Sequence, residues 1–266
     1  MKLKAIFCML IVFAVMGFSL DTSSVYAYGW GFKKSTENRP PDVGEYDNLL
    51  ENQEAIYKED TDEKNIYLTF DNGYEQGFTA DMLDVLKKHN VPAAFFVTGH
   101  YVKSEPDLIK RMAEEGHIIG NHSYGHPDFT KMSKKEVHKE LKKLKEAVQA
   151  ITDQETMNYV RPPRGTFNEK TLDWTEEFGY TQVFWSLAFK DWETNQQKGW
   201  KHAYEQVMDQ VHPGAIVLLH TVSEDNAEAL DKIIKRLKKD GYQFKSLDDL
   251  MIKQYLPDDF YQLMSS

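Results

Sequence analysis

The feature that most constrains the fold is an alternation of apolar, strand-like runs with helical patterns from residue 65 onward. One junction occurs three times, as EEGH at 114–117, EFGY at 177–180 and KDGY at 239–242. In each junction a helical pattern ends at a glycine suited to the left-handed cap, and a strand-like run begins directly after it. Strands that alternate with helices pair in parallel, because each helix returns the chain to the start of the next strand.

The predicted strands are 66–70, 93–99, 117–120, 158–161, 181–187, 215–219 and 242–246. The predicted helices are 79–89, 106–115, 133–151, 168–178, 200–211 and 226–240. About seven such units predict an α/β fold, a deformed (β/α) barrel, and an open doubly wound sheet is the alternative. In either fold, ligands bind at the C-terminal ends of the strands.

The amino terminus has the pattern of a signal peptide. Lys2 and Lys4 precede a long apolar run, and a small-residue cleavage site ends at Ala27. We therefore expect residues 1–27 to be removed and the exported, mature chain to begin near Tyr28. An uncleaved membrane anchor is the alternative, because the apolar run is only slightly short for a transmembrane span.

We divide the rest of the chain into an N-terminal arm (28–64), a catalytic domain (65–255) and a C-terminal tail (256–266). The arm is irregular and contains several glycines and prolines. Its Trp30 and Phe32 favour packing on the barrel over a disordered linker. The apolar spacing between Leu49 and Tyr57 predicts one short helix within the arm.

The charge balance limits the kinds of partner. The chain has a formal net charge of −10, and an acidic chain without a basic stripe argues against nucleic acid. A ligand must therefore be recognised by a shaped site. The single cysteine, Cys8, lies in the predicted signal peptide, so the mature chain would have neither a disulfide nor thiol chemistry.

Polar and ionisable residues gather where the predicted strands end. They are Asp71 and Asn72 after the first strand, Asn121 and His122 after the third, Arg161 at the end of the fourth, Asp191 beyond the fifth and His220 after the sixth. Because parallel strands bring their C-terminal ends to one edge, these side chains are candidates for a common site.

Each candidate also has a structural explanation when it is taken alone. His122 and His126, four residues apart, could bind one metal ion or could be solvated loop residues. His220 could cap a strand, and Asp71 could shape a turn. Arg161 precedes two prolines that keep its backbone extended, which suits an oriented guanidinium, although a surface ion pair would also explain it.

Other aromatic and histidine residues can be explained by structural roles. Trp192, beside Asp191, could pack in the hydrophobic core. Structural roles also suffice for His100, His117 and His212.

Five ordered motifs together carry a specific resemblance. They are TFDNG (69–73), HSYGH (122–126), RPPRG (161–165), DW (191–192) and LLH (218–220). Over about residues 65–250 the chain resembles the polysaccharide deacetylases of the NodB-homology type, carbohydrate esterase family 4. The resemblance implies a deformed (β/α) barrel, a divalent metal ion, usually zinc or cobalt, and removal of acetyl from N-acetylated sugars in a polymer.

The resemblance also implies roles for individual residues. His122, His126 and Asn72 would bind the metal ion. Asp71 would be the general base, with Arg161 orienting it. The remaining roles are His220 as the general acid, Asp191 as the residue that tunes or orients it, and Trp192 and Leu218 as the lining of the pocket for the acetyl methyl group.

Three positions depart from the usual family pattern. Asn72 replaces a metal-binding aspartate, Ala188 occupies the expected position of an acidic residue, and Arg164 stands where tyrosine is common. These features resemble the subgroup of spore-cortex deacetylases that act on N-acetylmuramic acid in peptidoglycan, toward muramic δ-lactam. A cation at Arg164 could contact the lactyl or a freed carboxylate of that sugar. Because Asn72 offers oxygen without charge, we expect weak metal binding.

The expected partner is therefore the glycan strands of peptidoglycan, at the cell wall or spore cortex, with no stable protein partner implied. Three alternatives remain open. The chain could deacetylate polymers of N-acetylglucosamine, in chitin or peptidoglycan. It could be a catalytically weak carbohydrate-binding relative, or a metal-dependent hydrolase of a different amide. Retention of both Asp71 and His220 argues against a protein that only binds.

Overall fold

The computed structural model describes residues 26–35, 37–51 and 53–256. Most of the predicted signal peptide and nearly all of the predicted tail lie outside the described residues. None of the helices in these ranges has the length and apolarity that a bilayer crossing needs.

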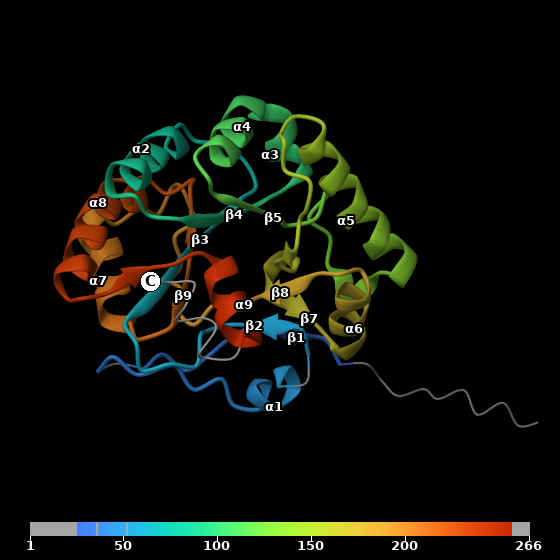
Figure 1. Cartoon of the computed structure of the whole chain (residues 1–266), viewed down its shortest axis with the longest axis horizontal. Helices are drawn as coiled ribbons and strands as arrows, with labels where there is room; N and C mark the ends of the chain where they lie inside the picture. Colours follow the sequence, from blue (N-terminus) through green and yellow to red (C-terminus); the bar gives the residue numbers. More distant parts are fainter. Residues whose placement is uncertain (1–25, 36, 52, 257–266) are drawn as a thin grey trace, which may run out of the picture.

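A curled sheet of parallel strands forms the framework (Figure 1), in the order β10-β3-β4-β5-β6-β8-β2, with β9 also paired to β3. The strands are β2 (Ala55–Ile56), β3 (Asn65–Asn72), β4 (Ala93–Val97), β5 (Ile118–Asn121), β6 (Tyr159–Val160), β8 (Thr181–Val183), β9 (Ala215–His220) and β10 (Gln243–Phe244). Beyond β8 the chain meets β9 at a Leu187–Val217 bridge, where Leu218 N donates to Leu187 O at 2.9 Å. The predicted deformed barrel is confirmed.

Helices surround this sheet (Figure 1). They are α2 (Thr79–His89), α3 (Gly99–Ser104), α4 (Pro106–Glu114), α5 (Lys134–Gln149), α6 (Glu169–Glu177), α7 (Trp200–Gln210), α8 (Glu224–Lys239) and α9 (Leu247–Tyr255). The six predicted helices are all present, whereas α3 and α9 were not predicted. At the three repeated junctions, Gly116, Gly179 and Gly241 have φ of 78°, 81° and 88°, which is the left-handed region that glycine tolerates best.

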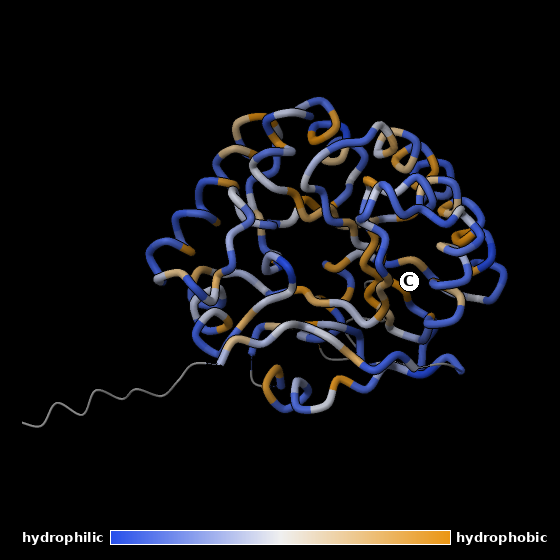
Figure 2. The backbone as a smooth tube through the Cα atoms, turned by 180° about the vertical axis from the view of Figure 1, so that it is seen from behind, coloured by the Kyte–Doolittle hydropathy of each residue, from blue (hydrophilic) through white to orange (hydrophobic). Residues whose placement is uncertain are grey.

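The pleat of β3 decides which side chains face the interior of the barrel. Leu68 and Phe70 belong to the large cluster that packs beneath the helices, whereas Tyr67 belongs to a separate cluster. Figure 2 shows hydrophobic stretches along the central strands and at recurring positions of the helices. Because successive side chains of a strand point to opposite faces, Asp71 lies on the side of Tyr67 and Asn72 on the side of Phe70.

The N-terminal segment packs against the barrel and forms a separate two-stranded sheet with β7. β1 (Tyr28–Gly29) pairs antiparallel with β7 (Thr166–Phe167). Trp30 is 8% exposed, and its Nε1 donates to Trp185 O at 2.9 Å. The helix predicted between Leu49 and Tyr57 is wrong at its C-terminal end. Helix α1 spans only Tyr46–Leu50, and Ala55–Ile56 is β2, which pairs in parallel with β8.

Candidate active site

Asp71 and Arg161 form a buried ion pair at the C-terminal end of β3. Arg161 Nη1 donates to Asp71 Oδ1 at 2.7 Å. The guanidinium is fully buried and also donates to Thr69 Oγ1 at 2.8 Å and to Val183 O at 2.9 Å. Burial alone would raise the pKa of Asp71, but the cationic surroundings, Arg161 above all, hold it below the ordinary value. Asp71 is therefore ionised at neutral pH and fixed in orientation.

His220 and Asp191 form a second pair at the end of β9. His220 Nδ1 lies 2.7 Å from Asp191 Oδ1, and the other carboxylate oxygen accepts from His220 N at 2.8 Å and from Asn226 Nδ2 at 2.6 Å. Burial would lower the pKa of His220, but the Asp191 carboxylate raises it above the ordinary value. The imidazole is thereby favoured in its protonated form, which can donate a proton.

His122 and His126 converge on a third point of the same site. Their Nε2 atoms are 3.2 Å apart, and His122 Nδ1 donates to Arg161 O at 2.8 Å. That bond places the proton on Nδ1 and leaves a lone pair on Nε2. Burial lowers the pKa of His122, and burial together with the neighbouring His122 lowers the pKa of His126 to about 4. Both rings are therefore neutral, as metal ligands must be.

Asn72 lies on the other side of β3 from Asp71. It is fully buried, and its Nδ2 donates to Thr221 Oγ1 at 2.7 Å. Its Oδ1 has no hydrogen-bond partner among the described residues. No group of three or more His, Cys, Asp or Glu side chains within the described ranges is arranged to bind a metal ion. Asn72 does not line the cavity that His122 and His126 line, so the structure does not bring together the three residues that the sequence predicted as metal ligands.

A cavity of about 440 Å³ opens above these pairs. Its lining residues are Asp71, Gly73, Tyr74, Thr98, His100, His122, Tyr124, Gly125, His126, Trp192, His220 and Val222. Trp192 lies with its ring centre 5.5 Å from that of His220. Trp192 and Tyr74 are 48% and 44% exposed, so two aromatic side chains border the cavity that Asp71 and His220 also line. Aromatic faces of this kind suit the apolar faces of sugar rings.

The backbone near the cavity contains three residues in the left-handed region. Ser123, His126 and Arg164 have φ of 64°, 56° and 61°, which is uncommon for residues other than glycine. His126 N donates to Ser123 Oγ at 2.9 Å, which helps to hold that loop. Strained backbone at a ligand site is a recognised feature of preorganised sites.

Two residues predicted to contact the substrate, Arg164 and Leu218, do not line the cavity. Arg164 is exposed and lies near enough to His126 to help lower the pKa of that ring, but it does not line the cavity. Leu218 is buried in β9 and is likewise absent from the cavity lining. The predicted contact of Leu218 with the acetyl group therefore finds no support, and Val222 lies at the cavity instead.

Several residues that line the cavity were not predicted from the sequence, among them Tyr74, Thr98 and His100. Thr98 and His100 follow β4, and Tyr74 follows β3. The signal was available, because the rule that ligands bind at the C-terminal ends of strands applies to β4 as well. His100 has a structural explanation in the sequence, yet the fold places it at the cavity mouth.

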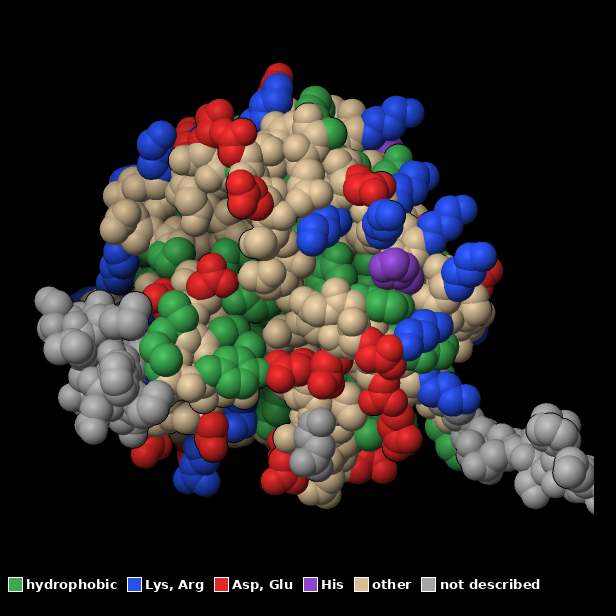
Figure 3. Space-filling view, turned by 45° about the vertical axis from the view of Figure 1, so that its right-hand side comes forward, with side chains coloured by type: hydrophobic (Ala, Val, Ile, Leu, Met, Phe, Trp, Pro, Cys, Tyr) green, Lys and Arg blue, Asp and Glu red, His purple; other side chains and the backbone are tan. Residues whose placement is uncertain are grey.

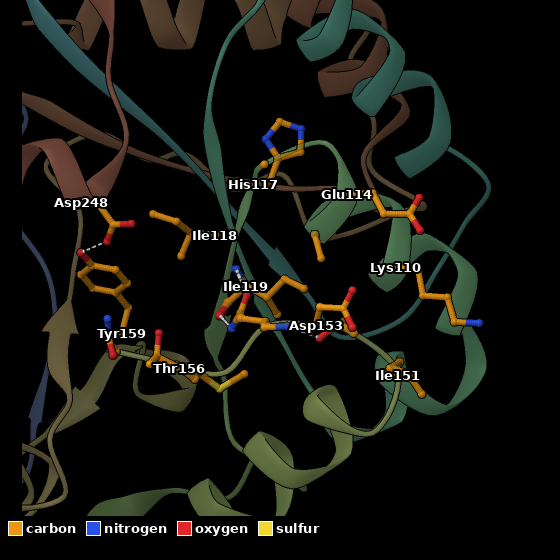
Figure 4. Close-up of a pocket in the computed structure, with 16 residues that line it drawn as sticks. Lys110, Glu114, His117, Ile118, Ile119, Ile151, Asp153, Thr156, Tyr159 and Asp248 are labelled. Atoms are coloured by element: carbon orange, nitrogen blue, oxygen red, sulfur yellow. Dashed lines mark hydrogen bonds between the residues drawn. The ribbon is translucent and has the colours of Figure 1, made fainter.

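A second cavity, of about 480 Å³, lies near the start of β5, next to α4 (Figure 4). Gln154 borders it and pairs with the backbone of Ile119, accepting from its N at 3.3 Å and donating to its O at 3.1 Å. Nearby, Tyr159 OH donates to Asp248 Oδ1 at 2.6 Å. Asp71, His122, His126 and His220 do not line this second cavity; they line the cavity above β3 and β9.

Comparison with known proteins gives consistent results. The family model for polysaccharide deacetylases matches residues 58–183. The peptidoglycan-N-acetylmuramic acid deacetylase PdaA of Bacillus subtilis is 57% identical over 226 residues, covering 85% of this chain and 86% of that protein. The solved structure of B. subtilis PdaA, described as a family 4 carbohydrate esterase, has a TM-score of 0.84 and 56% identity, covering 86% of this chain and 98% of that chain.

A more distant relative acts on a different sugar. The peptidoglycan-N-acetylglucosamine deacetylase PgdA of Listeria monocytogenes is 38% identical over 187 residues, covering 70% of this chain and 39% of that protein. The fold and these similarities define a hydrolytic sugar deacetylase. The chain belongs to the polysaccharide deacetylase family, the NodB-homology group of carbohydrate esterase family 4.

Proposed function

We propose that this protein removes acetyl from N-acetylmuramic acid in peptidoglycan, toward muramic δ-lactam in spore cortex. The observation that carries deacetylation is the pair of oppositely tuned groups, Asp71 and His220, at one cavity, and the choice of muramic acid rests on the 57% identity to PdaA. One is held ionised and the other is favoured as protonated. Amide hydrolysis needs both a base for water and an acid for the leaving amine. Deacetylation of N-acetylglucosamine polymers is the second candidate, favoured by the similarity to PgdA.

Each of these residues has a separate role in the proposed hydrolysis. Asp71 takes the proton from the attacking water, and Arg161 holds the carboxylate in position by the 2.7 Å hydrogen bond. His220 gives a proton to the nitrogen of the departing amine, with Asp191 holding the ring by its Nδ1. Trp192 and Tyr74 exclude water from the sugar face and position the ring. Attack by water at the acetyl carbon and cleavage of the C–N bond yield acetate and the free amine.

A divalent metal ion, zinc or cobalt, fits the histidine pair. Deacetylases of this family are metalloenzymes. The 3.2 Å separation of the two Nε2 atoms is about that of two nitrogens each bound to one ion at roughly 2.0–2.1 Å. The Oδ1 of Asn72 has no hydrogen-bond partner among the described residues, but it would become a third ligand only if the end of β3 turned it toward the histidine pair. A bound ion would supply an activated water and polarise the acetyl oxygen.

Asn72→Asp is expected to tighten metal binding. Two neutral imidazoles and one amide provide no anionic ligand, whereas a carboxylate at position 72 would add a charge that hard and borderline ions prefer. Titration of chelator-treated wild type and variant with zinc or cobalt, followed by calorimetry, measures the affinities directly. Equal affinity of the two proteins would contradict the charge argument, and full activity of the chelated enzyme would contradict the metal role.

The substrate assignment is tested by mass analysis of each sugar. Peptidoglycan strands of known composition and chitin oligomers are incubated with the protein and then digested to single sugars. We expect a loss of acetyl from muramic acid and little from glucosamine. Release from chitin with none from muramic acid would favour the second candidate, and release from neither would favour a carbohydrate-binding relative. New amino-acid termini without acetate would indicate hydrolysis of a different amide.

Arg164 is proposed to recognise the carboxylate of the muramic lactyl group. It is a cation close to His126, held in an uncommon backbone conformation. Arg164→Ala is expected to raise KM for muramic acid substrates by about tenfold, because a charge-assisted hydrogen bond contributes roughly 1.5–3 kcal/mol. The change should leave kcat/KM for chitin oligomers unaltered. An equal loss on both substrates would instead indicate a structural role of Arg164 in its loop.

Action outside the cytoplasm follows from a peptidoglycan substrate. We propose that residues 1–27 direct export and are then removed, and N-terminal sequencing of the exported protein should begin near Tyr28. A first residue of Met1 would favour the anchored alternative.

A further inference from the structure

A row of three lysines runs along the outer face of α5. Lys135, Lys139 and Lys143 are spaced four residues apart, which places them one above another on a helix, and all three are exposed. The apolar residues of the same helix, Val137, Leu141, Leu144 and Val148, are buried on a different face. In Figure 3 a band of Lys and Arg side chains runs down the right-hand part of the surface, on the side where α5 lies in Figure 1.

The lysine row is not neutralised by the protein. Other lysines near it form ion pairs, such as Lys134 with Glu177 and Lys142 with Glu146. Within the part of the chain that the structure describes, no carboxylate lies within 4.0 Å of the three ammonium groups of the row. Like charges four residues apart on a helix repel each other. The row thus concentrates positive charge on one face of α5, in a chain whose formal net charge is −10.

The row reaches the rim of the catalytic cavity. Lys143 Nζ lies 3.7 Å from the ring centre of Tyr124, and Tyr124 lines the cavity. The next residue of that loop, Gly125, donates its N–H to Glu140 Oε2 of α5 at 2.6 Å. The loop with His122 and His126 is therefore fastened to the helix that carries the row.

We propose that the lysine row binds carboxylates of the peptidoglycan strand outside the sugar that is being deacetylated. The inference rests on the proposed function and adds a binding surface beyond the cavity. Peptidoglycan carries carboxylates on its stem peptides, and on the lactyl groups of muramic acids that bear no peptide, whereas chitin carries none. Exposed lysines on a helix can follow such a polymer, because their flexible stems tolerate variable positions of the partner. The sequence predicted an acidic chain without a basic stripe. The chain as a whole is acidic, but α5 carries a local row of positive charge.

The test compares two triple variants with the same change in charge. The row variant is Lys135→Gln, Lys139→Gln and Lys143→Gln. The control is Lys201→Gln, Lys232→Gln and Lys239→Gln, on α7 and α8 at the other side of the molecule (Figure 1). Each set also contains a lysine that lies over an aromatic ring. Lys232 Nζ is 4.6 Å from the ring centre of Trp200, and Lys143 Nζ is 3.7 Å from that of Tyr124.

Binding is measured by co-sedimentation with insoluble peptidoglycan, and KM by acetate release from peptidoglycan and from chitin oligomers. The peptidoglycan is first freed of phosphate-containing polymers, and one portion has its carboxylates converted to amides. We expect the row variant to bind the carboxylate form about tenfold more weakly, since three exposed charge pairs are lost. Its binding should also depend less on salt. The control should match wild type, and all three proteins should bind the amidated form equally.

Several outcomes would overturn the proposal. One is equal binding of the row variant and wild type to peptidoglycan. Another is a loss of binding in the control as large as that in the row variant. A third is weaker binding of the row variant than of wild type to amidated strands. A lysine effect seen only before removal of phosphate polymers would reassign the surface to those polymers. Co-sedimentation needs no catalysis, so failure of the proposed deacetylation would be seen separately, as absence of acetate.

Discussion

Asp71→Asn is expected to lower kcat for deacetylation by ~10²–10⁴-fold, the usual contribution of a general base. The asparagine keeps an oxygen that can accept from Arg161 Nη1, so the geometry of the 2.7 Å contact is preserved. It cannot take a proton from water at neutral pH. The loss should therefore appear in kcat, measured as acetate release at saturating substrate, with KM changed far less.

Stability must be separated from chemistry in this variant. Arg161 is fully buried, and removal of the charge of its partner can cost ~3–5 kcal/mol. The matched control is Glu59→Gln, because Glu59 is also a buried carboxylate, in an ion pair with Lys253 at 2.7 Å. Glu59 contacts the opposite end of β3, where its Oε2 accepts from Asn65 Nδ2 at 2.9 Å.

Circular dichroism and thermal unfolding should show both variants folded at the assay temperature and both less stable than wild type. Only Asp71→Asn should lose activity. If Asp71→Asn retained activity within a few-fold of wild type, Asp71 would be removed from the mechanism. An equal loss in Glu59→Gln would show that the effect is one of stability.

The order of strands and helices could be predicted because local patterns specify it. The six predicted helices follow an apolar spacing of 3.6 residues, and three of them end at glycines that take the left-handed conformation. The short elements were harder. β2 has only two residues, and its identity as a strand depends on pairing with β8. Such pairing between segments far apart in the sequence leaves no local signal.

The site could be predicted in part for a similar reason. Asp71, His122, Arg161 and His220 lie at strand ends, and parallel strands bring those ends together whatever the details of packing. For adjacent residues of one strand, the sequence does not say which of them faces the site. Asp71 and Asn72 point to opposite faces, so Asn72 is buried away from the cavity. The face that each of them takes depends on the register of β3 against its neighbours.

His220→Ala is expected to lower kcat by ~10²–10⁴-fold, because the leaving amine then lacks its proton donor. The milder substitution Asp191→Asn tests how Asp191 sets the pKa of His220. Asp191 raises the pKa of His220 through its charge and through the 2.7 Å hydrogen bond to Nδ1. Asparagine retains the shape but removes the charge, so burial should dominate and lower the pKa of His220.

The direction of the pH effect follows from the role of His220 as an acid. The active form is the protonated imidazole, which is present below its pKa and lost as the pH rises through it. In wild type the raised pKa of His220 extends activity toward higher pH. In Asp191→Asn the alkaline limb of the kcat profile should move to lower pH, with the peak rate also reduced. An alkaline limb that stayed in place while kcat fell would assign Asp191 a purely structural role. A limb that moved to higher pH would exclude His220 as the acid, because loss of the Asp191 charge lowers the pKa of that imidazole.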